Sequence, residues 1–116
     1  MNRLILLCAV LLFLSGCGPV NRIAISIEAS ENKDNLQKIE LGLSANQVKN
    51  IMGLPRRTEA FSLPEGNNYL VWYYVTEKKA PFRGLEDWNY TPMVFEKDRL
   101  TGWGYLHLDE IRKNRK

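Results

Sequence analysis

The spacing of apolar residues divides the chain into a short N-terminal segment and a longer mixed region. Residues 4–14 form an uninterrupted apolar run, which is preceded by Arg3 and followed by Ser15 and Gly16. The run is shorter than the roughly 20 apolar residues that a membrane-spanning helix needs. A basic start, a short apolar run and small residues are the order found in a secretory signal peptide. The pattern therefore predicts that residues 1–16 are a signal peptide.

Residues 17–35 show no apolar periodicity and are mostly polar from Glu28 onward. Such a composition is typical of a solvated linker, so we predict a flexible tether. Within it three isoleucines alternate with other residues, at positions Ile23, Ile25 and Ile27. Their spacing fits either an edge strand or an apolar segment lying close to a membrane, and both interpretations stay open.

The first element with a strong pattern is a helix over residues 45–52. Ser44 stands at its N-cap and Gln47 follows three residues later, which is the capping-box pattern. Gly53 provides the helix stop, and Pro55 prevents the helix from continuing. The apolar residues of this segment recur on one helix face, namely Val48, Ile51 and Met52.

After Pro55 the apolar period changes from that of a helix to that of a strand. The pattern predicts strands over residues 57–63, 69–77, 91–96 and 100–108, joined by loops at 64–68 and 78–90 and a turn at 97–99. In the strand 69–77 one face carries Leu70, Trp72 and Tyr74, and the other carries Tyr69, Val71, Tyr73 and Val75. Gly102 and Gly104 indicate a bend or close packing against an aromatic ring. A C-terminal turn is expected over residues 109–114.

Together these elements predict an α+β fold. Short helices are expected to pack on one face of a three- to four-stranded antiparallel meander sheet. We expect the folded domain to cover residues 36–111 and residues 112–116 to form a solvated basic tail.

Composition narrows the classes of function. The chain has 16 Lys and Arg against 13 Asp and Glu, a formal net charge of +3. This charge is too close to neutral to indicate nucleic-acid binding. The cysteines are Cys8 and Cys17. Because Cys8 lies in the predicted signal, the processed chain has no pair of cysteines for an internal disulfide.

The segment Leu14-Ser15-Gly16-Cys17 resembles the lipobox of bacterial lipoproteins. The resemblance implies cleavage before Cys17 and a covalent lipid on its sulfur, which anchors the chain to a membrane. Gly18 stands where an aspartate would favour retention at the inner membrane. The predicted location is therefore the outer membrane, facing the periplasm, with the inner membrane less favoured.

A second resemblance covers roughly residues 39–106. Motif pieces occur in order at Gly42-Leu43-Ser44, Val48 and Met52-Gly53-Leu54-Pro55, followed at strand positions by Trp72, Tyr74, Phe95 and Leu100. This order is similar to that of the SmpA/OmlA (BamE-like) small outer-membrane lipoproteins. Two departures are Leu43 in place of the usual methionine and the long aromatic loop 78–90.

This second resemblance implies both a fold and a role. The fold is a helical pair on a three-stranded antiparallel sheet, and related folds occur in β-lactamase-inhibitor-like domains. The role is that of an accessory to the machine that inserts outer-membrane β-barrels, although a shared fold does not establish a shared partner.

Catalytic candidates are few. The chain has one histidine, His107, and the only thiol left after processing is that of Cys17. A lone histidine near a strand end is more often a packing residue than a base, and the Cys and His count excludes the usual zinc sites. Glu86 and Asp87 are neighbouring loop carboxylates that we expect to face solvent. We therefore expect no enzyme, no metal, no small-molecule substrate and no cofactor besides the lipid on Cys17.

Binding has better support, because aromatic residues and arginine concentrate in the loop 78–90. These residue types are enriched in interface hot spots. The candidate partner-binding residues are Phe82, Arg83, Leu85, Trp88 and Tyr90 in the loop, and Tyr73 and Trp103 on the sheet. The alternative is that these rings fold back over the sheet and complete the core of a small domain.

The sequence thus predicts a non-catalytic envelope lipoprotein that binds another envelope protein or complex as an accessory or scaffold subunit. Its expected partners are the membrane, through the lipid anchor, and that envelope protein. One alternative is an inhibitor of a periplasmic or extracellular enzyme, with the aromatic loop as the inhibitory plug. A third possibility is a binder of a small ligand or of peptidoglycan, for which the sequence shows no convergent polar site.

Overall fold

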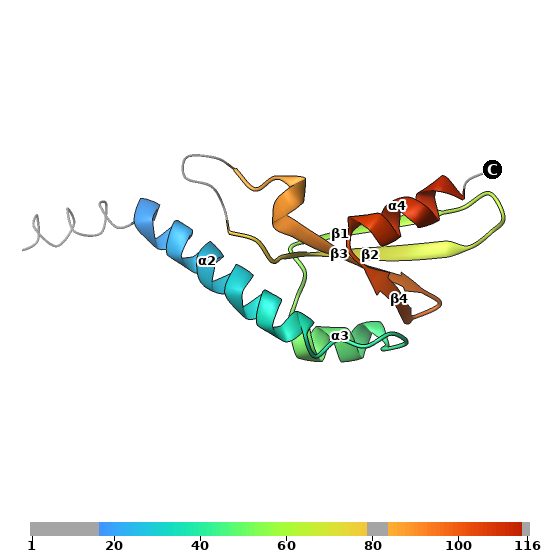
Figure 1. Ribbon diagram of the computed structural model, residues 1–116, viewed down its shortest axis with the longest axis horizontal. Helices are drawn as coiled ribbons and strands as arrows, with labels where there is room; N and C mark the ends of the chain where they lie inside the picture. Colours follow the sequence, from blue (N-terminus) through green and yellow to red (C-terminus); the bar gives the residue numbers. More distant parts are fainter. Residues whose placement is uncertain (1–16, 79–83, 115–116) are drawn as a thin grey trace, which may run out of the picture.

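The computed structural model describes residues 17–78 and 84–114, with side chains from Ile23 onward. The elements in chain order are α2 (Cys17–Leu36), α3 (Ala45–Met52), β1 (Arg57–Ser62), β2 (Asn68–Val75), the 3-10 turn η1 (Asp87–Asn89), β3 (Tyr90–Glu96), β4 (Arg99–Trp103) and α4 (Tyr105–Lys113). The predicted α+β class is confirmed, because the four strands form one antiparallel meander sheet with helices packed around it (Figure 1).

The predicted signal peptide, residues 1–16, lies outside the described residues. Within the described part, no helix combines the length and the apolar character that crossing a membrane requires.

The sheet has the simplest antiparallel topology, with strand order β1-β2-β3-β4. The first three predicted strands agree with β1, β2 and β3 to within two residues at each end. A two-residue turn joins β3 to β4, and its residues Lys97 and Asp98 have positive φ angles of 49° and 58°. This conformation matches the twist of the strands that it connects.

Helix α3 has the ends that the sequence predicted. The Ser44 hydroxyl accepts a hydrogen bond from the Gln47 backbone amide, and the Gln47 side chain accepts one from the Ser44 amide. Gly53 follows the helix with a φ of 80°. The buried cluster between α3 and this face of the sheet consists of Ile39, Val48, Met52, Tyr74, Met93, Phe95 and Leu100. Leu70 and Trp72 pack against that cluster, so the predicted assignment of Leu70, Trp72 and Tyr74 to one face is confirmed.

The other face of the sheet is covered by α4, which corrects the prediction that the helices lie on one face. The predicted strand 100–108 is wrong beyond Trp103, because Gly104 turns the chain with a φ of 93° and α4 begins at Tyr105. Leu108 of α4 is fully buried against Val71, Tyr73 and Val94. A strand would have buried alternate residues, whereas the helix leaves Leu106 77% exposed and packs the partly buried Tyr105 and Ile111, three residues before and after Leu108, against the same cluster.

The close packing predicted at Gly102 is confirmed. A Cβ atom at Gly102 would lie 2.7 Å from the imidazole ring of His107, which belongs to α4. The Nε2 atom of His107 lies 2.9 Å from the Thr101 hydroxyl, so the ring is held against the strand.

Residues 17–35 form most of α2, so the prediction of a flexible tether is wrong for this segment. Ile25 and Ala29 are buried one helical turn apart and pack against Val75 at the end of β2. The Asn32 side chain is also buried and donates a 2.9 Å hydrogen bond to the Val75 carbonyl. The buried stripe of α2 is narrow and includes an asparagine. The amino-acid composition of the segment is therefore similar to that of a solvated linker.

Candidate functional site

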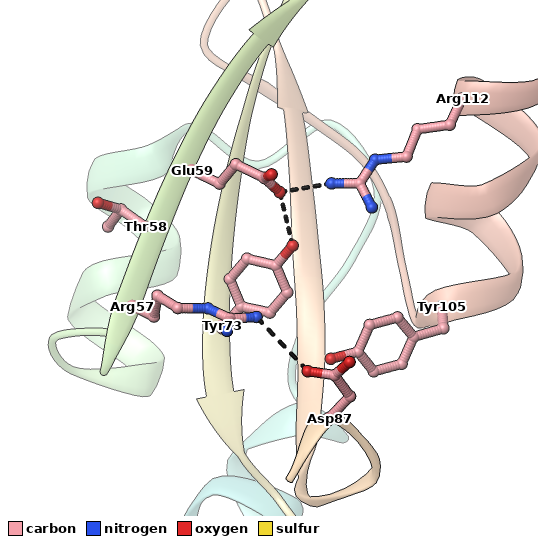
Figure 2. Close-up of a pocket in the computed structure, with 7 residues that line it drawn as sticks. All are labelled: Arg57, Thr58, Glu59, Tyr73, Asp87, Tyr105 and Arg112. Atoms are coloured by element: carbon pink, nitrogen blue, oxygen red, sulfur yellow. Dashed lines mark hydrogen bonds and ion pairs between the residues drawn. The ribbon is translucent and has the colours of Figure 1, made fainter.

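A polar pocket of about 440 Å³ opens between β1, α4 and η1 (Figure 2). It lies on the sheet face that α4 covers. The lining residues are Arg57, Thr58, Glu59, Tyr73, Asp87, Tyr105 and Arg112. Its volume falls within the range of roughly 300–1,000 Å³ that is usual for ligand sites, although most such sites are more apolar.

Strand and helix periodicity bring these side chains together. Arg57 and Glu59 are two residues apart on β1, so both point to the same face. Tyr73 lies opposite Arg57 in the β1–β2 register and forms the floor of the pocket. Tyr105 and Arg112 are seven residues apart on α4, which is about two helical turns.

Glu59 is the most fully engaged carboxylate of the pocket. Its Oε1 atom accepts a 2.7 Å hydrogen bond from the Tyr73 hydroxyl and a second, short one from Arg112 (Figure 2). Burial, followed by the hydrogen bond to Glu59, raises the pKa of Tyr73. The Arg112 guanidinium also lies over the Phe61 ring, at 5.3 Å from its centre. This end of the pocket is therefore held together by its own ion pair.

Arg57 at the other end is engaged more loosely. Its guanidinium lies over the rings of Tyr73 and Tyr90, at 4.1 and 5.4 Å from their centres. Its closest carboxylate oxygen belongs to Asp87 and lies 4.0 Å from Nη2, which is longer than a hydrogen bond. The Asp87 side chain is 83% exposed. An exposed pair at this distance contributes little to stability.

The Tyr105 hydroxyl is the unusual group of the site. Its oxygen is buried, and no described residue forms a hydrogen bond with it. Burial, with a smaller effect of the Asp87 charge, raises the pKa of Tyr105 to about 12. The hydroxyl is thus protonated at neutral pH, and it is a donor without an acceptor. Buried polar groups are nearly always paired, so such a group indicates a functional requirement or a missing partner.

The pocket combines guanidinium and phenol donors with carboxylates, which suits recognition of a polar or charged group. His107 lies outside it, and the described residues contain no cluster of three or more metal-ligating side chains.

The structure brings together only some of the residues that the sequence singled out. Tyr73 forms the pocket floor, and Tyr90 lies beside Arg57. Leu85 is half-buried and packs against the cluster of Ile25, Ala29 and Val75, as the alternative of inward folding required.

The remaining candidates lie apart from the pocket or outside the described residues. Trp88 is 52% exposed, and its indole Nε1 donates to Glu86. Trp103 lines a separate shallow hollow with Leu41, Gly102 and His107. Phe82 and Arg83 lie outside the described residues. Cys17 is the first residue of α2, but its side chain is not among those described.

Sequence reasoning missed Arg57, Glu59, Tyr105 and Arg112. The expectation that Asp87 faces solvent is confirmed, because its side chain is 83% exposed, but the sequence did not place it at a pocket. Arg112 was assigned to a basic tail, which is wrong, because it belongs to α4 and pairs with Glu59. A signal for the first pair was present, since Arg57 and Glu59 alternate on the strand face that also carries Phe61. No sequence signal places the α4 residues, because their role depends on the chain reversal at Gly104.

Comparison with known proteins gives one match. The chain belongs to the DUF3192 family, which is described as a protein family of unknown function, and the matched residues are 23–110. No curated protein and no solved structure matches the chain. The match covers the sheet, α3 and most of α2 and α4, so the pocket lies almost wholly within the family region.

Proposed function

We propose that this member of the DUF3192 family is a non-catalytic lipoprotein of the bacterial envelope. A lipid on Cys17 anchors it to the outer membrane, facing the periplasm. It binds another envelope protein or complex and acts as an accessory subunit of it.

The polar pocket is the observation that carries this proposal. Arg57 and Tyr105 are donors whose requirements are not met within the described chain, at a surface that remains open. Trp88, next in sequence to Asp87, adds an exposed aromatic ring. Arginine, tyrosine and tryptophan are the residues most enriched in interface hot spots.

The motif order Gly42-Leu43-Ser44 to Pro55, which resembles that of the BamE-like lipoproteins, supports an envelope partner. The specific partner that we propose from this resemblance is a complex that assembles outer-membrane proteins. The DUF3192 match is independent of this resemblance and names no partner.

The test is a mild-detergent pull-down of the full lipidated chain at native expression level, read by mass spectrometry. We expect reproducible recovery of an integral envelope complex, above all one that assembles outer-membrane proteins. Recovery of a single soluble enzyme would instead favour an inhibitor. Recovery of nothing reproducible would contradict the accessory-subunit function.

The lipid anchor is tested separately by Cys17→Ser. This variant lacks the thiol that carries the lipid, so we expect it to leave the membrane fraction or to remain unprocessed. Cell fractionation and intact-protein mass measure both outcomes. Cys8→Ser is the matched control, because Cys8 lies in the predicted signal and should not affect anchoring. A Cys17→Ser variant that stays in the outer membrane with a lipid-modified mass would contradict the anchor.

A further inference from the structure

Arg57 is the cation of the pocket whose N–H donors are not committed to a close ion pair. Its side chain is 51% exposed, and among the described residues the carboxylate paired with it is that of Asp87, at 4.0 Å. Its guanidinium carbon lies over the Tyr73 ring, at 4.1 Å from the ring centre, and an arginine held against an aromatic face can still donate from its N–H groups. Arg112 differs, since it is committed to Glu59.

Tyr105 supplies a second donor beside Arg57. Figure 2 shows the Tyr105 hydroxyl near the carboxylate of Asp87, and the charge of Asp87 contributes to the raised pKa of Tyr105. No hydrogen bond joins the two side chains. The free energy of leaving a buried hydroxyl unpaired would be recovered if an acceptor reached it.

The Asp87 carboxylate occupies the position from which an acceptor would reach the Tyr105 hydroxyl. It faces both Arg57 and Tyr105, yet it is hydrogen-bonded to neither, and its high exposure leaves it free to rotate away. A carboxylate arriving from outside could approach Arg57 to about 2.8 Å, the usual distance of a charge-assisted hydrogen bond. Asp87 therefore acts as a weak internal substitute for an external carboxylate.

The charge of the pocket restricts the anion that it can take. Glu59 and Asp87 line the same pocket as the two arginines, so a doubly charged phosphate would meet repulsion from both carboxylates. A singly charged carboxylate meets less repulsion and matches the planar fork of Arg57. A cationic ligand is disfavoured at Glu59, because the Glu59 carboxylate is already paired with Arg112 and Tyr73.

We propose that the pocket binds an acidic side chain of the partner protein, with Arg57 and the Tyr105 hydroxyl as the donors to its carboxylate. The inference rests on the proposed function in one respect, namely that the carboxylate belongs to a partner protein.

The first experiment titrates the full chain in detergent micelles with short peptides. The probe is N-acetyl-Gly-Glu-Gly amide, and its neutral control has Gln in place of Glu. Binding is followed by NMR on the Nε–H signal of Arg57. We expect saturable shifts with the Glu peptide and about tenfold weaker binding of the Gln peptide.

Several results of this titration would overturn the proposal. They are equal binding of the Glu and Gln peptides, tighter binding of a Lys peptide or of inorganic phosphate, and no saturable shift. Free acetate or free glutamate binding more tightly than the Glu peptide would identify a small acid as the ligand, and would overturn the assignment to a partner side chain.

The second experiment repeats the Glu-peptide titration with variants of the pocket and follows it on the backbone amide signals of β1 and α4, because Arg57→Gln lacks the Nε–H group. Arg57→Gln should weaken binding about tenfold or more, and Tyr105→Phe about fivefold. Asp87→Asn should strengthen binding, because the competing carboxylate is gone. A purely structural role of Asp87 predicts no gain, so an unchanged or weaker affinity of Asp87→Asn would contradict the proposal. The charge-matched controls are Lys49→Gln and Asp109→Asn, which change exposed residues outside the pocket.

The two proposals fail in distinguishable ways. If the Glu peptide binds at Arg57 but the lipidated chain captures no partner, the carboxylate site stands and the accessory-subunit function fails. If a partner is captured equally by the wild type and by Arg57→Gln, the accessory function stands and the pocket is not its contact.

Discussion

At the scale of single residues, two tyrosines on opposite faces of the sheet show how differently one side chain type is used. The Tyr74 hydroxyl is paired, because it donates a 2.8 Å hydrogen bond to the Gly53 carbonyl and so ties β2 to the end of α3. The Tyr105 hydroxyl oxygen is also buried but has no described partner. Removing each hydroxyl should therefore have a different effect on folding.

We predict that Tyr74→Phe lowers the free energy of unfolding by about 1 kcal/mol, since a hydrogen bond is lost. Tyr105→Phe should leave it unchanged or raise it, because only an unpaired buried group is removed. Urea denaturation of the two variants in parallel measures the difference. A loss of stability in Tyr105→Phe as large as in Tyr74→Phe would mean that the Tyr105 hydroxyl has a structural partner.

At the scale of elements, the end of α3 at Gly53 depends on a backbone conformation that the glycine in the sequence indicates directly. Gly53 has a φ of 80° and a ψ of −164°, a region that is accessible essentially to glycine alone. Nothing lies within 4 Å of a Cβ added there, so the cost of a substitution is conformational rather than steric.

Gly53→Val should accordingly destabilise the domain by about 1–3 kcal/mol. Gly84→Val is the matched control, because Gly84 is exposed, has open space for a Cβ and lacks a positive φ. Thermal melting of both variants gives the comparison. Equal melting temperatures would show that the helix stop does not depend on glycine.

Helix α2 depends on tertiary contacts instead. Asn32 pairs with the Val75 carbonyl in a buried position, and Arg56 forms an ion pair of 2.7 Å with Glu28. Asn32→Ala should cost about 1–3 kcal/mol, because the Val75 carbonyl loses its partner. The neighbouring exposed residue provides the control, Glu31→Ala, which should have little effect. Hydrogen exchange should show faster exchange along α2 only in Asn32→Ala, and similar exchange in both variants would contradict the docking of α2 through Asn32.

At the scale of the whole molecule, the two covered faces of the sheet shield several tyrosines. Burial is the main cause that raises the pKa of Tyr69, Tyr73, Tyr74 and Tyr105 above the ordinary value of 10.0. In the unfolded chain these phenols ionise near pH 10, whereas in the folded chain they stay protonated to higher pH. Folding stability is therefore complete below pH 10 and falls as the pH rises toward the folded-state values.

We predict that the urea midpoint falls between pH 10 and about 12, the pKa of Tyr105. The tyrosinate absorbance of these four phenols should appear together with unfolding rather than before it. In Tyr74→Phe the loss of stability across this range should be smaller, because one raised pKa is removed. A midpoint that stays constant across the range would mean that the phenols ionise equally in both states.

The pocket could be predicted from the sequence only in part. Tyr73 and Tyr90 were among the candidates because aromatic residues in a strand and beside a loop are visible in the sequence. The sequence places Tyr105 in a strand and Arg112 in a tail. It does not reveal the chain reversal at Gly104, because that reversal is stabilised by the packing of α4 on the second face of the sheet. In the sequence Arg57 and Glu59 are ordinary charged residues of a strand, and only the packing of α4 and η1 beside them forms the pocket.

What the sequence by itself determined is local. The capping box and glycine stop of α3, the alternation along β2 and the boundaries of β1 and β3 depend on residues within a few positions of one another. Tertiary structure alone decided that residues 17–35 are helical, that α4 covers the second face, and that Arg57, Asp87 and Tyr105 meet. The physical reason is that these features are stabilised by contacts between distant segments, whose short or mixed patterns carry no strong period of their own.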